Sequence, residues 1–391
     1  MTDKQRIETR LVHTGEPKVD GAVALPIFQS STFLSEEGLG YHDIRYARLS
    51  NTPNHIALHE KLASIEGAEA ALVTSSGMAA ISTTLLTLLG TGDHLLAQNV
   101  LYGGTYDLVT KDFPGYGISL DLVSGSDPDE WKAKLRPETK AFYVESISNP
   151  LMGVPRLDDV VAFCREHDLT SIIDNTFATP VNFRPAEHGF DLVMHSATKY
   201  LNGHTDVIAG AVIGKRDLVD RVKHKLDHLG GSLDTHACFL LHRGLKTLAL
   251  RVRHQNASAL AIAKFLDGHK AVSRTHYPGL ESHAGHAIAA RLFEGFGGMF
   301  SFEFEGGVEA VDRLFRRLSV PISAPSLGGP ETLVTRPAAS SHAGLTPAER
   351  EKAGISDGLV RVSVGLEATE DLIEDFSQAL DGRPNGTSRS Q

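Results

Sequence analysis

The stretch AALVTSSGMAAISTTLLTLL, residues 70–89, carries the pattern that decides the fold. It begins with a short apolar run, turns through small hydroxyl residues and Gly77, and continues as an apolar-periodic segment. The run has the length of a buried strand, and the segment has that of a helix. The same alternation recurs up to Gly214, and repeated strand–helix units build a mainly parallel sheet. We therefore expect an α/β fold whose seven strands have their apolar runs at Ala70–Val73, His94–Ala97, Ile118–Val123, Ala141–Val144, Ser171–Ile173, Leu192–Met194 and Val207–Ile213.

The remainder of the chain predicts an arm, a linking helix and a second, smaller α/β domain. Residues 236–267 carry apolar side chains at helical spacing without an internal proline, which predicts one long helix. Strand and helix patterns restart after Tyr277-Pro278-Gly279. The predicted boundaries are an N-terminal arm at 1–45 that contacts a neighbouring subunit, a large domain at 46–235, the linking helix at 236–267, a small domain at 268–380 and a polar, disordered tail at 381–391.

Composition excludes several classes of protein. The formal net charge of −10 argues against a nucleic-acid surface. No window holds the roughly 18 consecutive apolar residues of a membrane span, and Met1–Arg10 lacks the apolar core of a secretory signal. We therefore expect a cytoplasmic protein without a membrane or nucleic-acid partner. The two cysteines lie in apolar helical contexts and the 19 histidines form no metal-binding pair, so no metal is expected.

Reactive side chains follow three of the predicted strands. Asp174 ends one run, Lys199 closes Ser196-Ala197-Thr198-Lys199 after another, and a Ser-Ser-Gly turn at 75–77 leads into a helix. Ligands of open α/β sheets bind beyond the carboxyl ends of the strands. Each feature alone has an ordinary structural explanation, as a surface lysine, a helix cap or a tight turn. Together they match pyridoxal 5'-phosphate (PLP), which needs a lysine, a carboxylate for its ring nitrogen and a phosphate cradle.

The motifs around these residues resemble one known family. HSATKYLNGH, residues 195–204, resembles the cofactor-lysine motif of the Cys/Met metabolism PLP-dependent enzymes, of the cystathionine γ-synthase and γ-lyase type. SSGMAA, residues 75–80, resembles their phosphate turn. The resemblance covers roughly residues 5–380 and implies the PLP-dependent transferase fold of the aspartate aminotransferase type, fold type I. Further matches are residues 46–48, 101–105, 145–150, 174–178, 243–248, 326–329 and 359–363.

The resemblance implies roles around the cofactor. Lys199 would hold PLP covalently and move protons between substrate carbons, Asp174 would pair with the ring nitrogen, and Tyr102 would stack on the ring and take part in proton transfer. The phosphate would be held by Ser76, Gly77, Met78, Ser196 and Thr198, joined by Tyr46 and Arg48 from a neighbouring subunit. A shared site implies a homodimer, and the family suggests a homotetramer.

The resemblance also implies a substrate-binding group. Arg361 would grip the substrate α-carboxylate with its planar fork, assisted by Asn149, Ser326 and Tyr46. A surface salt bridge is the alternative interpretation of Arg361 alone.

Four reactions share this scaffold, and one sequence separates them poorly. We expect chemistry at the γ-substituent of a homoserine-derived amino acid, with cystathionine, O-acyl-homoserine and cysteine as substrates. Pro325 and the segment 228–241 favour a plant-type cystathionine γ-synthase, with cystathionine γ-lyase next to it. Cystathionine β-lyase and methionine γ-lyase are alternatives, although Gly104 stands where methionine γ-lyases place a cysteine. Asn51-Thr52-Pro53 departs from the family's usual Asn-Pro-Thr, which leaves the substrate specificity open.

Other classes are less compatible with the sequence. It contains no G-x-G-x-x-G after a strand, as a nicotinamide dehydrogenase requires. The G-x-S-x-G pattern of serine hydrolases occurs at Gly354–Gly358, but it comes directly before the apolar run at 359–364 and not after a strand, as a serine hydrolase requires. A non-catalytic scaffold of the same fold need not keep Lys199, Asp174, Tyr102 and Arg361 together. An absorbance band from the lysine-bound cofactor would separate enzyme from scaffold.

Overall fold

The computed structural model describes residues 5–34, 38, 40–41, 44–304, 306–340, 343–344 and 346–382. Residues 1–4 and other parts of the predicted arm, and residues 383–391 of the predicted tail, lie outside the described residues. The chain forms two compact units, one of Met1–Ser146 with Pro155–Ala249 and one of Ile147–Val154 with Leu250–Gln391. The second unit therefore includes a short segment, Ile147–Val154, that comes between two strands of the first unit in the order of the sequence.

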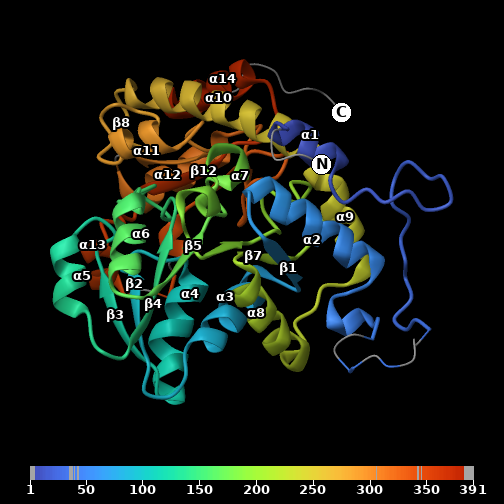
Figure 1. Ribbon diagram of the computed structural model, residues 1–391. Helices are drawn as coiled ribbons and strands as arrows, with labels where there is room; N and C mark the ends of the chain where they lie inside the picture. The colour runs from blue at the N-terminus through green and yellow to red at the C-terminus, as the bar shows by residue number, and fades with distance from the viewer. Residues whose placement is uncertain are drawn as a thin grey trace. The chain divides into compact units, whose positions relative to one another are not determined.

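The first unit is built on a seven-stranded sheet with the order β1-β7-β6-β5-β4-β2-β3 (Figure 1). Only β7 runs antiparallel to its neighbours, which confirms the predicted, mainly parallel sheet. The last strand begins at Gly210, not at the predicted Val207. The strands are β1 (Ala70–Thr74), β2 (His94–Gln98), β3 (Ser119–Val123), β4 (Thr139–Glu145), β5 (Thr170–Asp174), β6 (Leu192–His195) and β7 (Gly210–Gly214).

Helices pack on this sheet because its strands present apolar side chains on both faces. Helices α3 (Gly77–Leu88) and α8 (Arg216–Leu229) share one apolar cluster with Tyr143 of β4 and Ile172 of β5. Successive strand residues point to opposite faces. Phe142, the neighbour of Tyr143, accordingly packs edge-on against Trp131 of α5 (Pro128–Lys134) and Phe163 of α6 (Leu157–Glu166). The other helical segments are α2 (Pro53–Glu66), α4 (Gly103–Asp107), α7 (Thr179–Asn182), η1 (Ala47–Leu49), η2 (Leu108–Asp112), η3 (Phe113–Tyr116) and η4 (Pro185–His188).

Part of the predicted arm packs on the first unit itself. Helix α1 (Ile7–His13) is followed by Glu16, which lies among cations from α2 and from the end of α9 (Thr235–Leu245). The buried Lys61 donates to the Leu11 carbonyl at 2.8 Å and to Glu16 Oε1 at 2.9 Å, and Lys246 Nζ lies 2.8 Å from Glu16 Oε1. These contacts tie the segment to α2 and α9.

The prediction of one helix over residues 236–267 is wrong. The segment forms α9 and α10 (Leu248–Asp267), separated by Lys246 and Thr247. The N–H of Lys246 bonds to the Arg243 carbonyl, and that of Thr247 bonds to the Gly244 carbonyl, so the pattern tightens to three-residue spacing and the helix ends. Gly244 packs so closely on Asn202 that an added Cβ would lie 2.3 Å from its carbonyl oxygen.

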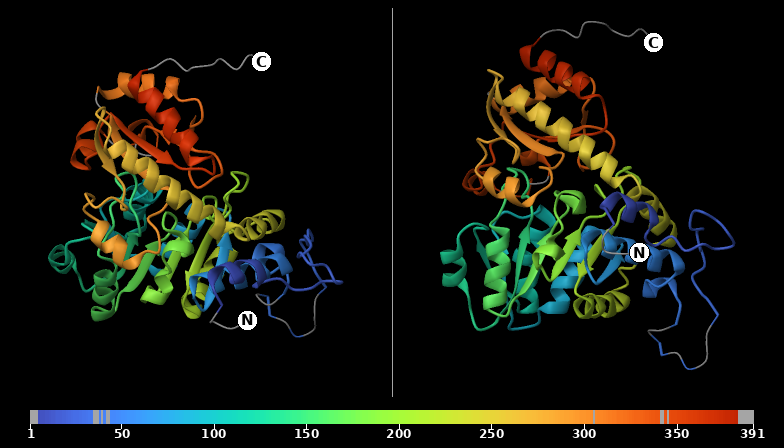
Figure 2. Two further views of the ribbon diagram at one scale, coloured as in Figure 1. Left: turned by 90° about the horizontal axis from the view of Figure 1, so that it is seen from above. Right: turned by 45° about the horizontal axis from the view of Figure 1, so that its top comes forward.

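The second unit is a smaller α/β domain, as predicted (Figure 2). Its sheet has the order β10-β11-β12-β9-β8, and only the β10–β11 pair is parallel. Val360 and Val362 of β12 join an apolar cluster with α10, α12 and α14, so Arg361 between them points to the opposite face. The elements are β8 (Val272–His276), β9 (Met299–Phe304), β10 (Ile322–Ser323), β11 (Leu333–Thr335), β12 (Leu359–Ser363), α11 (His286–Leu292), α12 (Gly307–Arg317), α13 (Pro347–Lys352), α14 (Thr369–Asp381) and η5 (Pro337–Ala339).

In the described part of the chain, no helix combines the length and apolar character that crossing a membrane requires. The described residues also contain no cluster of three or more His, Cys, Asp or Glu side chains arranged to hold a metal ion.

Candidate active site

Two carboxyl groups lie at the carboxyl edge of the large sheet. Glu145 ends β4, Asp174 ends β5, and the two residues are register partners. They lie on the face of the sheet that also carries Tyr143 and Ile172, because side chains two residues apart share a face. Helix α3 packs on this same face and begins directly after β1. Asp174, the predicted partner of the cofactor's ring nitrogen, therefore lies on the same face of the sheet as α3. It also lies at the same edge as the N-terminus of α3, where the predicted phosphate turn is found.

Asp174 is held by Thr176. The half-buried Asp174 accepts the Thr176 N–H at 2.9 Å on Oδ1. Removal from water raises the pKa of the Asp174 carboxyl, while hydrogen bonds from the hydroxyl and N–H of Thr176 act in the opposite direction. The Thr176 hydroxyl oxygen also accepts the N–H of Ser196 at 2.8 Å. Thr176 thus fixes both Asp174 and Ser196, the first residue of the segment Ser196–Lys199, which we call the lysine loop.

Glu145 contacts the backbone of Tyr102. The buried Glu145 accepts the Tyr102 N–H at 2.5 Å on Oε1. Burial first, and the neighbouring Asp174 charge second, raise the pKa of Glu145 well above its ordinary value. Burial likewise raises the pKa of the Tyr143 phenol, and the charges of Asp174 and Glu145 add to the shift.

The beginning of α3 is the predicted phosphate turn. Ser76 caps the helix, and its hydroxyl accepts the Ala79 N–H at 3.0 Å. Gly77 lies against Ser196, and a Cβ at position 77 would lie 2.9 Å from the Ser196 Cβ. Glycine is therefore needed where the predicted phosphate turn meets the segment that leads to Lys199. N–H groups and the positive end of the dipole at a helix N-terminus favour a phosphate.

Lys199 lies in the turn that follows β6. Its N–H donates to the Ser196 carbonyl at 3.1 Å, and its carbonyl accepts the Gly203 N–H at 2.7 Å. Thr198 is anchored by its hydroxyl, which donates to the Ala209 carbonyl at 3.1 Å and accepts the Ala209 N–H at 3.0 Å. His195 Nε2 lies 2.6 Å from the buried Glu66 Oε1 and fixes the end of the strand.

Tyr102 presents a partly exposed ring at the start of α4. The side chain is 47% exposed, although it is large and aromatic. A Cβ at Gly104 would lie 2.8 Å from the Tyr102 ring and 3.0 Å from Met78 Sδ. The ring therefore packs over Gly104, close to the predicted phosphate residue Met78.

The predicted carboxylate-binding group lies in the second unit. Arg361 Nη1 donates to Asn149 Oδ1 at 3.0 Å, and Nη2 donates to the Ser326 carbonyl at 3.3 Å. Arg361 is 5% exposed. Ser326 has a φ of 94°, which is unusual for a residue other than glycine. The structure thus brings together three of the four residues that the family resemblance implies for substrate binding, and Tyr46 is not among these contacts.

Tyr46 and Arg48 form a separate cluster on either side of the start of η1. The Arg48 guanidinium donates to the Asp227 carbonyl and to the Tyr41 hydroxyl. It lies over the Tyr46 ring, 5.7 Å from the ring centroid. These are contacts within one chain, and the predicted contribution to a neighbouring subunit's site stays a prediction.

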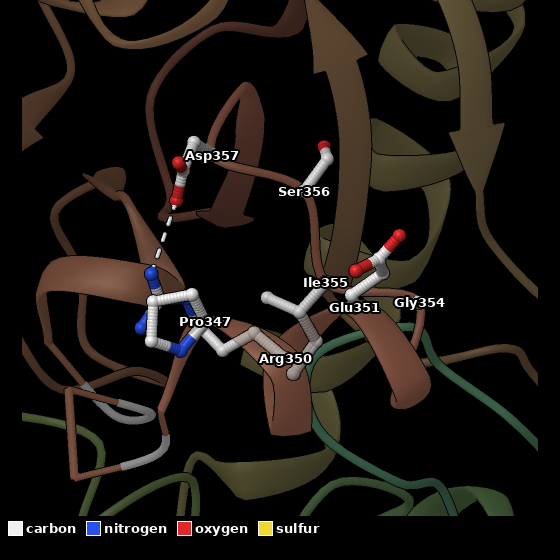
Figure 3. Close-up of a pocket in the computed structure, with 7 residues that line it drawn as sticks. All are labelled: Pro347, Arg350, Glu351, Gly354, Ile355, Ser356 and Asp357. Carbon is white, nitrogen blue, oxygen red and sulfur yellow. Dashed lines mark hydrogen bonds and ion pairs between the residues drawn. The ribbon is translucent and has the colours of Figure 1, made fainter.

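A pocket of about 340 Å³ lies elsewhere in the second unit (Figure 3). Arg350 and Asp357 form an ion pair there, with Nη2 of Arg350 3.5 Å from Oδ1 of Asp357. None of the predicted site residues lines this pocket, whose walls are formed by Pro347, Arg350, Glu351, Gly354, Ile355, Ser356 and Asp357.

Sequence reasoning gave no role to Glu145 or Thr176. Both lie in quoted motifs, and Glu145 ends a strand as Asp174 does, so the rule that identified Asp174 was a usable signal for Glu145. The partner of Glu145 is a backbone N–H 43 residues away, which no side-chain pattern reveals.

Known proteins are similar to this chain in both sequence and fold. The sequence profile of the Cys/Met metabolism PLP-dependent enzymes matches residues 8–381. The chain belongs to this family. It is similar to a cystathionine beta-lyase of Lactococcus lactis subsp. cremoris, with 43% identity over 96% of this chain and 99% of the relative. An L-methionine gamma-lyase of Fusobacterium nucleatum subsp. polymorphum is 41% identical over 97% of this chain and 99% of that relative.

The fold comparison agrees with the family. The crystal structure of cystathionine gamma-lyase from Lactobacillus plantarum, complexed with L-serine, matches with a TM-score of 0.92 and 36% identity, over 96% of this chain and 99% of that one. The fold type I prediction is confirmed, and this family member is a PLP-dependent enzyme.

The residues of the first unit fit the cofactor. A half-buried Asp174 beside a second carboxyl group favours a bound cation, and a protonated ring nitrogen supplies one. The close contact between Gly77 and Ser196 brings a helix N-terminus and the lysine loop together, as a phosphate cradle next to the lysine requires.

Proposed function

We propose that this enzyme cleaves a carbon–sulfur bond of cystathionine by elimination. The observation that carries the proposal is the Arg361–Asn149–Ser326 cluster, a buried fork suited to an amino-acid carboxylate, in a chain whose first unit fits PLP. The names of the relatives support a lyase.

Two positions of cleavage are supported by different observations. Elimination at the γ carbon agrees with the sequence expectation and with the similar crystal structure of a cystathionine gamma-lyase. Elimination at the β carbon is favoured by the cystathionine beta-lyase that is 43% identical. Methionine cleavage ranks lower. Methionine γ-lyases place a cysteine where this chain has Gly104, and a Cβ at this position would lie 2.8 Å from the Tyr102 ring.

The proposed roles follow from the chemistry of each group. When bound, PLP supplies an electron-withdrawing ring that makes the substrate Cα proton acidic. Lys199 Nζ removes that proton and returns it later in the reaction, and the Asp174 carboxylate keeps the ring nitrogen protonated. Tyr102 stacks on the ring. Arg361 orients the substrate through its carboxylate, assisted by Asn149.

The N-terminus of α3 and the lysine loop hold the cofactor phosphate in this proposal. Ser76, Gly77 and Met78 contribute from the helix, and Ser196 and Thr198 contribute from the loop. Anchoring of Thr198 by Ala209 supports a fixed cradle, because both of its hydroxyl bonds go to one backbone position.

We also propose a homodimer with shared sites, assembled further into a homotetramer, in the cytoplasm. Tyr46 and Arg48 of one subunit would complete the phosphate and substrate site of the other. Mixing Arg48→Ala with Lys199→Ala protein after joint unfolding and refolding tests this. Random pairing restores about a quarter of wild-type activity if sites are shared, since half the dimers then carry one intact site. No recovery would contradict sharing.

Product analysis tests the reaction. Cysteine and 2-oxobutanoate from cystathionine identify γ-elimination, and homocysteine and pyruvate identify β-elimination. Cystathionine formed from O-acyl-homoserine and cysteine would instead establish the synthase reaction that Pro325 favours. A rate equal to that of Lys199→Ala with every substrate would overturn the proposal.

A further inference from the structure

Tyr102 combines an exposed ring with a fixed backbone. Its N–H donates to Glu145 Oε1 at 2.5 Å, and its carbonyl accepts the Tyr106 N–H at 2.9 Å in the first turn of α4. The residue is nevertheless 47% exposed. A large aromatic side chain that is held in place without being buried is suited to stacking on a ligand.

The ring is also restricted from one side. Gly104 leaves no room for a Cβ, which would lie 2.8 Å from the Tyr102 ring. Met78 Sδ borders the same space, 3.0 Å from that Cβ position. Packing on one side and the Glu145 hydrogen bond at the backbone together restrict where the ring can point.

Glu145 is itself fixed at the end of β4. Its N–H donates to Gln98 Oε1 at 3.0 Å, and its position opposite Asp174 is set by the sheet register. The carboxyl group is buried, and burying a carboxyl group costs free energy unless it is hydrogen-bonded. The Tyr102 N–H supplies such a hydrogen bond.

We propose that Glu145 is a positioning residue for Tyr102, whose N–H it holds so that the ring is presented at the edge of the sheet where Asp174 lies. The inference rests on the proposed role of Tyr102 as the residue that stacks on the cofactor. Glu145 itself touches neither cofactor nor substrate in this account.

Glu145 performs this role as a neutral acid. Asp174 accepts hydrogen bonds from Thr176 that favour its charged form, whereas the bond to Glu145 is from a single backbone N–H. When two adjacent carboxyl groups cannot both be ionised, the proton stays on the group that accepts fewer hydrogen bonds, which here is Glu145. Glutamine at 145 therefore keeps both the acceptor oxygen and the charge state, while alanine keeps neither the oxygen nor the contact.

The first test reads the Tyr102 amide directly. Protein labelled with ¹⁵N-tyrosine gives one signal per tyrosine, and Tyr102→Phe identifies the signal of interest. We expect Glu145→Ala to increase hydrogen exchange at this amide about tenfold or more, as for loss of one hydrogen bond, and Glu145→Gln to leave it close to wild type. Unchanged exchange in Glu145→Ala would overturn the proposal, whatever the enzyme's activity.

A matched control separates positioning from general loss of stability. Asp191 is a half-buried carboxylate that precedes β6 and accepts the Ser171 N–H at 2.8 Å and its hydroxyl at 2.7 Å. Asp191→Ala should lower the melting temperature without changing the Tyr102 amide. If Asp191→Ala changes exchange at Tyr102 as much as Glu145→Ala does, the effect is global and the proposal is wrong.

The second test measures the affinity for PLP by equilibrium absorbance. Glu145→Ala should weaken binding by about threefold to tenfold, the scale of one ring-stacking contact, and Glu145→Gln should restore most of it. In protein that already carries Tyr102→Ala, Glu145→Ala should cause little further loss of PLP affinity. Additive losses, or Gln as damaging as Ala, would show that Glu145 acts by its charge rather than through Tyr102. Failure of the proposed lyase reaction would appear in the products alone and leave both readouts intact.

Discussion

Glu145 and Asp174 face each other as register partners on neighbouring strands, yet their hydrogen-bond partners differ. Asp174 is bonded by Thr176, which also binds Ser196 of the lysine loop. Glu145 is bonded by the backbone of Tyr102. The sheet thus brings two like-charged groups together, and the loops on either side decide which of them keeps a proton.

This division predicts a pH dependence of stability. Glu145 has a pKa raised well above its ordinary value in the folded protein, so its contribution to stability is complete below the unfolded pKa of about 4.3 and is lost as pH rises toward the folded pKa. Glu145→Gln does not titrate. In the cofactor-free protein, the melting temperature of the glutamine variant should therefore exceed that of wild type increasingly from about pH 4 upward. Parallel melting curves across the pH range would show that Glu145 titrates normally.

Thr176 predicts a link between the acid and the lysine loop. Thr176→Val removes the hydroxyl that accepts the Ser196 N–H and bonds Asp174. We expect a loss of about 1–2 kcal/mol in the free energy of unfolding, and weaker PLP binding by about tenfold. Thr176→Ser retains the hydroxyl and serves as the matched control. Equal PLP affinity for the valine and serine variants would contradict the link.

Gly77 predicts a steric limit at the phosphate turn. In Gly77→Ala the new Cβ would lie 2.9 Å from Ser196 Cβ and 3.0 Å from its Cα, so one of the two loops must move. We expect PLP affinity to fall by at least about tenfold while most of the stability is retained. Gly115→Ala, where nothing lies within 4 Å of the new Cβ, is the control and should bind PLP as wild type does. Comparable affinity for the two alanine variants would refute the close contact.

Arg361 predicts a loss concentrated in substrate binding. Lysine keeps the charge but not the planar fork that bonds Asn149 and the Ser326 carbonyl. We expect Arg361→Lys to raise KM for cystathionine about tenfold to a hundredfold, with a smaller effect on kcat. Arg350→Lys alters another arginine of the same unit, which pairs with Asp357, and should leave KM unchanged. A KM for cystathionine that is unchanged in Arg361→Lys would contradict the role of Arg361 in substrate binding.

The sequence predicted the parallel sheet and the residues at its edge because both depend on local patterns. Apolar runs mark the strands, and polar residues directly after them mark the edge, as Asp174 shows. The arrangement of Arg361 with Asn149 and Ser326 came from the family resemblance, and the hydrogen bonds now join all three.

Features that depend on distant contacts were not predictable in this way. The break at Lys246 and Thr247 coincides with contacts to Glu16 and Asn202, which the helical periodicity does not contain. The seventh strand begins late, because Ala209 is bonded to Thr198 rather than to a neighbouring strand. The Tyr102–Glu145 hydrogen bond involves a backbone group, so side-chain types gave no sign of it.

The attachment point of the cofactor is the most direct test of the whole account. Purified protein loaded with PLP is reduced with borohydride, digested, and searched by mass spectrometry for a pyridoxyl-phosphate lysine. The account predicts this modification on Lys199, together with its loss and the loss of the visible absorbance band in Lys199→Ala. Modification of another lysine in place of Lys199, or a band that survives in Lys199→Ala, would contradict it.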